Sequence, residues 1–395
     1  MNSAPSIAST AGDWAKGAST PPGKSRRRGA RPAGMPWKAG ITPVRAAQVA
    51  VWELAGLAVL ATVFPLGAAG IVAIALGAVA VLFTSVRFDG LCWYQWCDVQ
   101  VHHRRRHRRV TSAGAPRDPL EAVLPGLRIS RHVDRAGNRI GLARVDDGWS
   151  AVVRLAPTGR MDSEALVSAL RTTFDRVDIR LSGAELVTWS VTGPPAHRGA
   201  PPENVRICWL ALRYLPSAAP RAALARGGAE RGAARTIASA AFGLVNQLAA
   251  AGQPSAVLDE QQLRQDLLVA LGADPAGLTG HSAIVVTETW RDWRAGRVRQ
   301  TCFVPRKERD ALTVLGRHAP QAAFTCTSYA LSRTPRGEVR GATTVRIGLP
   351  AAAKQQHEPV LRPDHVAHGL GVKLFTLNGR HAHHARATLP LALND

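Results

Sequence analysis

Apolar residues concentrate near the N-terminus in two consecutive stretches, residues 42–64 and 66–85. Each stretch matches the roughly 20 residues that a helix needs to cross a hydrocarbon core of about 30 Å. Pro65 and Gly67 lie at the boundary, where a helix has to break or turn. The pattern therefore predicts a two-helix transmembrane hairpin within residues 41–86.

Basic residues flank this hairpin on both sides. Residues 1–45 carry eight Lys or Arg, five further arginines lie between positions 104 and 109, and the connecting turn has no charge. Because Lys and Arg collect on the cytoplasmic side of membrane spans, we expect a multi-pass inner (plasma) membrane protein with both termini in the cytoplasm. Residues 1–40 have little apolar content and are predicted to form a disordered basic arm.

Small residues and one acid within the hairpin indicate packing against other helices. Ala69, Ala73 and Gly77 recur every four residues, and small side chains let helices approach closely. Glu53 places a carboxylate inside the first span, which costs about 3 kcal/mol on insertion scales. These four residues are the predicted membrane-packing positions. The abundance of alanine explains the stripe equally well, and Glu53 could instead be protonated or lie near the cytoplasmic interface.

Residues 87–117 form a predicted juxtamembrane segment and linker, first aromatic and then rich in arginine. Trp93, Tyr94 and Trp96 suit the headgroup layer, where an aromatic ring buries its body and keeps its polar tip wet. The arginines that follow would bind anionic lipid headgroups, with nucleic-acid binding as the alternative. They are Arg104, Arg105, Arg106, Arg108 and Arg109.

Residues 118–395 mix the strand and helix periods, which predicts a cytoplasmic α/β domain of the mixed (α+β) class. Strands are expected at 149–155, 184–192, 205–214, 282–289, 298–304, 323–331 and 339–349. The strand at 205–214 is apolar on both faces, so it should be central in its sheet. Helices are expected at 163–174, 237–248 and 259–271. The last of these opens with a capping pair, Asp259 and Gln262, and ends at Gly272.

The sequence offers no complete catalytic, cofactor-binding or metal-binding motif. No lysine follows GxxxxG, so an ATPase is not expected, and the five cysteines form neither a CxxC pair nor a disulfide framework. A glycine cluster at 227–232 could hold a phosphate at a helix start, but such starts are common. Gly280, His281 and Ser282 only partly match a nucleophile elbow. Histidines at 365, 368, 381, 383 and 384 lack a matching Cys or carboxylate, which favours a polar tail.

In their order along the chain, these features resemble the EccE family of type VII (ESX) secretion systems. The resemblance rests on the basic arm, Trp52 and Glu53, and the segments 93–109, 149–157, 208–213, 226–228 and 289–291. It implies a non-enzymatic structural subunit of an inner-membrane complex, a hetero-oligomer with EccB, the EccC ATPase and EccD. Such a subunit needs neither a cofactor nor nucleic acid. The alternatives are a membrane-anchored, glycosyltransferase-like enzyme and a tether that binds anionic lipid or nucleic acid.

Overall fold

The computed structural model describes residues 46–62, 68–88, 91–110, 118–156, 161–195, 202–272, 286–296, 298–307, 310–334, 337–350 and 362–393. All of them belong to one compact unit, Pro36–Asp395. The predicted basic arm, residues 1–40, lies outside the described residues.

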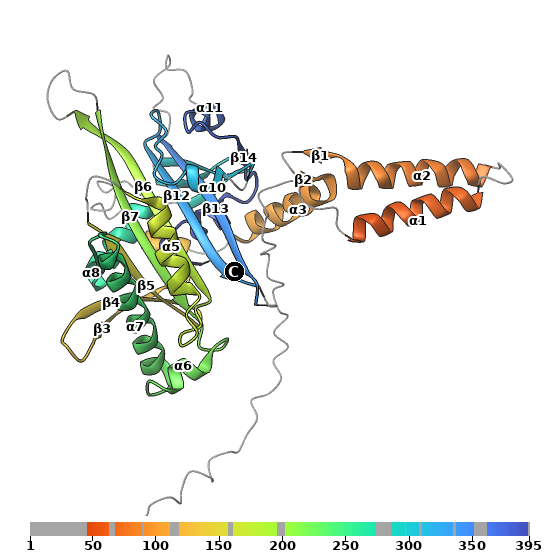
Figure 1. The fold of residues 1–395 in the computed structure, drawn as a ribbon. Coiled ribbons are helices and arrows are strands. Elements are labelled where there is room, and N and C mark those ends of the chain that lie inside the picture. The colour runs from red at the N-terminus through yellow and green to blue at the C-terminus, as the bar shows by residue number, and fades with distance from the viewer. Residues whose placement is uncertain are drawn as a thin grey trace, which may run out of the picture. The chain divides into compact units, whose positions relative to one another are not determined.

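The first two helices, α1 (Ala46–Thr62) and α2 (Ala68–Ser85), pack against each other as a hairpin (Figure 1). The indole Nε1 of Trp52 donates to Thr84 Oγ1 at 2.9 Å. Nearby, a Cβ added to Gly77 would lie 3.5 Å from the Val59 side chain. One polar contact and one close small-residue contact therefore join the two helices.

The prediction of a transmembrane hairpin is wrong. Within the described residues, no helix is both long enough and apolar enough to span a membrane. α1 has 17 residues and α2 has 18. The localisation as a multi-pass inner-membrane protein with cytoplasmic termini rested on these two spans, and it is corrected with them.

A short antiparallel pair, β1 (Arg87–Phe88) and β2 (Leu91–Cys92), leads from α2 into α3 (Trp93–Val110). The aromatic and basic residues predicted to lie at a lipid interface thus form a helix of 18 residues. Sequence reasoning gave this segment no secondary structure.

The remaining described residues build a twelve-stranded antiparallel sheet in the order β3-β4-β5-β7-β6-β12-β13-β11-β10-β9, with β8 beside β5 and β14 beside β11. The first strands are β3 (Arg128–Val133), β4 (Arg139–Val145), β5 (Gly148–Leu155), β6 (Gly183–Pro195), β7 (Pro202–Tyr214) and β8 (Ser255–Val257). The later strands are β9 (Val286–Glu288), β10 (Trp293–Ala295), β11 (Val298–Pro305), β12 (Phe324–Arg333), β13 (Val339–Pro350) and β14 (Leu374–Thr376).

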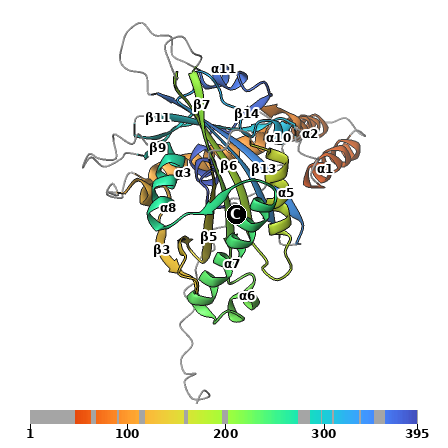
Figure 2. The ribbon, with the colours of Figure 1, turned by 60° about the vertical axis from the view of Figure 1, so that its left-hand side comes forward.

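The central position of β7, between β5 and β6, confirms the expectation from its apolar pattern. Its side chains alternate between two cores, because successive residues of a strand point to opposite faces. Leu210 and Leu212 enter the core under α5 (Ser163–Phe174) and α7 (Ala229–Ala250). Trp209 and Ala211 enter the opposite core, which holds α4 (Pro119–Val123) and α8 (Glu260–Leu271). Figure 2 shows α7 running alongside β5.

Helix α8 begins and ends as the sequence predicts. Asp259 and Gln262 form the reciprocal capping box, with the Gln262 N–H donating to Asp259 Oδ1 at 2.8 Å. Gly272 adopts the left-handed conformation that ends the helix (φ 71°). This segment is readable from the sequence because both signals are local.

The C-terminal segment folds into α11 (Pro363–His368), β14 and α12 (His381–Ala387). Beyond α12, Leu389, Leu391 and Ala392 are buried in the core that also contains α8. The interpretation of the histidines here as a polar tail is wrong for His381, which is fully buried, whereas His365, His368 and His383 are exposed. Three short helices complete the described secondary structure after β2: α4, α6 (Pro220–Leu224) and α10 (Asp310–Thr313).

Candidate interaction surface

The outer faces of α1 and α2 carry large apolar side chains that remain exposed. On α1, Leu54, Leu57 and Leu60 are between 61% and 75% exposed. The exposed set on α2 is Ile71, Val72, Ile74, Leu76, Val79, Val81 and Leu82. A helix that is apolar on all sides is normally buried, and a contiguous exposed apolar surface marks an interaction site. The hairpin is therefore the strongest candidate surface for a partner.

The four residues predicted to pack against other helices differ in their surroundings. Glu53 is exposed on α1. Gly77 is half-buried against Val59 of α1, so its small size allows α1 and α2 to pack closely against each other. Ala69 and Ala73 belong to α2, and their side chains lie outside the described part of the chain. Contacts of these residues with further helices stay a prediction.

The aromatic residues of α3 make contacts within the protein. Trp93, about 41% exposed, packs on Phe83 of α2 with the ring centroids 5.4 Å apart. The Tyr94 hydroxyl accepts a hydrogen bond from Gln95 at 3.2 Å. Trp96 meets Trp290 of the sheet domain edge-on, with centroids 5.6 Å apart. Arg104 and Arg105 are exposed, whereas the side chains of Arg106, Arg108 and Arg109 lie outside the described part of the chain. Their lipid-binding role stays a prediction.

Trp290 occupies the turn between β9 and β10 and joins three segments of the chain. Its ring contacts Trp96 and the buried His103 of α3, the latter also edge-on at 5.6 Å. Its carbonyl accepts the Gly379 N–H at 2.7 Å. A Cβ at Gly379 would overlap the indole, and the backbone there is left-handed (φ 70°), so both features favour glycine. Through Trp290, α3 is held against the sheet domain.

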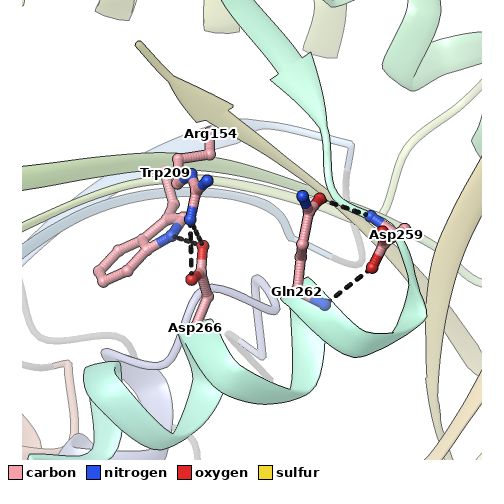
Figure 3. A network of polar contacts seen from close by, with 5 residues as sticks. All are labelled: Arg154, Trp209, Asp259, Gln262 and Asp266. Atoms are coloured by element: carbon pink, nitrogen blue, oxygen red, sulfur yellow. Dashed lines mark hydrogen bonds and ion pairs between the residues drawn. The ribbon is translucent and has the colours of Figure 1, made fainter. Parts of the chain in front are cut away.

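The position of α8 is fixed by a buried carboxylate (Figure 3). Asp266 accepts the indole N–H of Trp209 at 2.7 Å and a guanidinium N–H of Arg154 at 3.1 Å. Its side chain is 8% exposed, whereas that of Arg154 is 42% exposed. The indole hydrogen bond, buried from solvent, is the part of this network that fastens α8 to β7.

A buried arginine stabilises the other end of α8. Arg346 on β13 is fully buried and donates to the carbonyls of Ala270 and Leu271 and to Gln300 Oε1, the last at 2.6 Å. The last carbonyls of a helix carry partial negative charge, so a cation there is favourable. Gln300 also donates to the Leu271 carbonyl at 2.9 Å.

A buried carboxyl group on β6 holds the segment that follows α12. The Ala392 N–H donates to Glu185 Oε2 at 2.9 Å, and the Ser328 hydroxyl donates to Oε1. Burial raises the pKa of Glu185 to about 8, although Ser328, Ala392 and Arg346 all favour the ionised form. Ser150 on β5 adds a bond to the Leu391 carbonyl at 2.8 Å.

The residues that the sequence suggested for phosphate binding, catalysis or metal binding have structural roles where the structure describes them. Gly227 and Gly228 have positive φ at the turn before α7, and Gly232 lies too close to the Ala223 backbone to carry a Cβ. His381 accepts the Cys302 N–H at 3.1 Å, and burial lowers its pKa to about 3. The elbow-like residues 280–282 lie outside the described residues. Among described side chains, no group of three or more His, Cys, Asp or Glu is arranged to hold a metal ion.

Sequence reasoning missed a histidine held by two hydroxyls. Nδ1 of His318 lies 3.3 Å from Ser190 Oγ, and Nε2 lies 2.7 Å from Thr192 Oγ1. Burial lowers the pKa of His318. Ser190 is buried and donates to the Thr325 carbonyl, so its hydroxyl already has a structural role. The residues are more than 120 positions apart in the chain, and no local signal connects them.

Comparison with known families identifies part of this sheet domain. Residues 203–304 match the family model described as "Putative type VII ESX secretion system translocon, EccE". A comparison with curated proteins gives no match. The matched segment runs from β7 through α7 and α8 to β11, so it contains Trp209, Asp266 and Trp290. Of the side chains that fix α8 and hold α3 on the sheet, Trp209, Asp266, Trp290 and Gln300 lie within the matched segment, whereas Arg154 and Arg346 lie outside it.

Proposed function

We propose that this chain, whose residues 203–304 match the EccE family model, acts as a non-enzymatic structural subunit of a type VII (ESX) secretion system. It binds other components of the system through the α1–α2 hairpin. The observation that supports this role most directly is the exposed apolar surface of the hairpin.

The size of this surface supports a protein partner. Fully burying one leucine side chain contributes about 1.5–3 kcal/mol. Leu54, Leu57 and Leu60 are all more than half exposed, so docking them together would contribute roughly 3–6 kcal/mol. That is enough to change a dissociation constant by more than about a hundredfold.

The contacts of α3 explain how a bound hairpin would be coupled to the sheet domain. Phe83 of α2 packs on Trp93, and Trp96 of the same helix α3 packs on Trp290. Aromatic pairs of this kind contribute about 0.5–1.5 kcal/mol beyond their buried area. A partner held by the hairpin would therefore be held near the EccE-matched part of the sheet.

Co-purification from cells that express the whole secretion system tests the proposal. A tagged chain should recover EccB, EccC and EccD, and the triple variant Leu54→Gln, Leu57→Gln, Leu60→Gln should lose them. The matched control is Val177→Gln with Leu224→Gln, which changes exposed apolar residues of the sheet domain and should keep the partners. Equal recovery with the hairpin variant and the control would refute docking through the hairpin.

A further inference from the structure

One edge of the twelve-stranded sheet is unpaired within the described residues. β3 pairs with β4 alone, and every residue from Arg128 to Val133 is exposed or half-buried. β3 is six residues long, whereas β9 at the opposite edge has three. An edge strand of this length presents a row of unpaired N–H and C=O groups to a further strand.

The pairing register shows which main-chain groups face outward. At the hairpin end, Asp134 donates its N–H to the Asn138 carbonyl at 3.1 Å, which marks a hydrogen-bonded pair. Such pairs alternate with non-bonded pairs in an antiparallel ladder, so Arg131, opposite Gly141, belongs to a non-bonded pair. In agreement, Gly141 donates its N–H away from β3, to the Leu258 carbonyl at 2.8 Å.

By the same alternation, Ile129, Arg131 and Val133 turn their N–H and C=O groups away from β4. These residues share one face of β3, because side chains alternate with a period of two. That face lies towards α8, since the Arg131 guanidinium is 3.9 Å from the Glu260 carboxylate.

A groove of about 320 Å³ lies beside this edge, between α4, α8 and the start of β3. Its apolar lining consists of Leu120, Leu127 and Ile129. Its polar lining consists of Asp118, Glu121, Glu260 and Arg264. The groove therefore combines an apolar wall with an excess of carboxylates.

The charge of the groove opposes that of the whole chain. The chain has a formal net charge of +22, whereas three carboxylates and one guanidinium line the groove. Arg264 is paired with Asp118 at 2.7 Å. Glu260 lies 3.9 Å from the Arg131 guanidinium, so Glu121 is the acid best placed to attract a cationic side chain.

We propose that β3 binds an extended peptide segment of a partner protein as an added strand, with a lysine or arginine side chain of that segment in the groove. The aliphatic stem of such a side chain would lie along Leu127 and Ile129, and its cationic head would approach Glu121. Main-chain hydrogen bonds give the affinity in this mode of recognition, and the groove gives the selectivity. This surface lies in the sheet domain, and the inference does not depend on docking through the hairpin.

Fluorescence anisotropy with the full chain tests this inference. The probe is a labelled eight-residue peptide of alternating valine and threonine with one lysine at its centre. A second peptide carries glutamate in place of lysine, and a third carries N-methyl groups that block strand pairing. We expect the lysine peptide to bind at least about tenfold more tightly than either of the others. The glutamate peptide lacks the favourable charge, and the N-methylated peptide lacks the main-chain hydrogen bonds.

Two matched pairs of variants separate strand pairing from charge. Arg131→Pro removes an outward N–H, which an edge strand tolerates, and should weaken binding about tenfold relative to Arg131→Ala. Glu121→Lys should weaken binding by a similar factor, whereas Glu164→Lys on the exposed face of α5 should leave it within about twofold.

Several results would overturn the proposal. They are no binding of the lysine peptide, equal affinity for the glutamate or N-methylated peptide, and equal binding by the two Arg131 variants. Dimerisation of the chain that Arg131→Pro abolishes, measured by sedimentation, would assign the edge to a second copy instead. If Arg131→Pro does not fold, as judged by circular dichroism, the N-methylated peptide alone decides whether the strand pairs.

Discussion

The buried carboxyl group of Glu185 makes the stability of the sheet domain depend on pH in a direction that can be calculated. Its pKa is about 8 in the folded protein, against 4.5 for an ordinary glutamate, chiefly because burial disfavours the charged form. The folded-state pKa is thus raised above the unfolded one. The stabilisation is fully present below pH 4.5 and is lost as the pH rises towards 8.

The magnitude follows from the size of the shift. One pKa unit corresponds to about 1.4 kcal/mol, so the loss between pH 4.5 and 8 is on the order of 5 kcal/mol. The variant Glu185→Gln has no charge to gain. Its amide oxygen can still accept the Ala392 N–H, and its amide nitrogen can donate to the Ser328 hydroxyl.

Urea unfolding of both proteins at a series of pH values measures this effect. The free energy of unfolding of the wild type minus that of Glu185→Gln should fall by about 1.4 kcal/mol per pH unit between pH 5 and 8. Buried histidines such as His381, whose pKa is lowered, act in the opposite direction, but they are common to both proteins and cancel. The control Glu164→Gln, on an exposed side chain, should give a flat difference. A difference for Glu185→Gln that is flat or rises with pH would refute the reasoning.

Three further substitutions test the supports of the fold. Asp266→Ala should lower the free energy of unfolding in urea by about 2–3 kcal/mol, because it leaves a buried indole N–H without an acceptor, and Asp266→Asn should recover most of the loss. Gly272→Ala should lower the melting temperature more than Gly126→Ala. Both glycines have positive φ, which alone costs about 1–2 kcal/mol, but only at Gly272 would the new Cβ meet an aromatic ring. Trp96→Ala and Trp290→Ala should give a coupling energy of about 1 kcal/mol in a double-mutant cycle, and strict additivity would contradict their contact.

The sequence predicts elements whose signals are local. The alternation of β5, the continuous apolar run of β7, the capping box of α8 and its terminal Gly272 all lie within a few residues of what they determine. Hydropathy also located α1 and α2, but it placed them across a membrane. Hydropathy measures how apolar a segment is, and it does not distinguish lipid from a protein partner.

Features that depend on distant contacts were missed. His381 lies in a run of histidines and arginines that looks polar. It is nevertheless buried, and its ring accepts a hydrogen bond from the backbone N–H of Cys302, 79 residues away. β3 has two arginines and a histidine among six residues, so its apolar pattern is weak, and its place at the edge is set by pairing with β4. In the sequence, Asp266 is indistinguishable from an exposed acidic residue of a helix. Only the fold shows that Trp209 of β7 lies beside it.

The segment after α12 also bears on how this protein is made. Ser150 and Leu391 are bonded across 241 positions, and Glu185 and Ala392 across 207. On a ribosome, β5 and β6 emerge long before the residues that cover their buried polar groups. Until those residues have been synthesised, Glu185 in the nascent sheet lacks the segment that covers it, and incompletely folded states of this kind are prone to aggregate. We expect a ribosome-associated chaperone or another holdase to bind the nascent chain until Leu391 has left the exit tunnel.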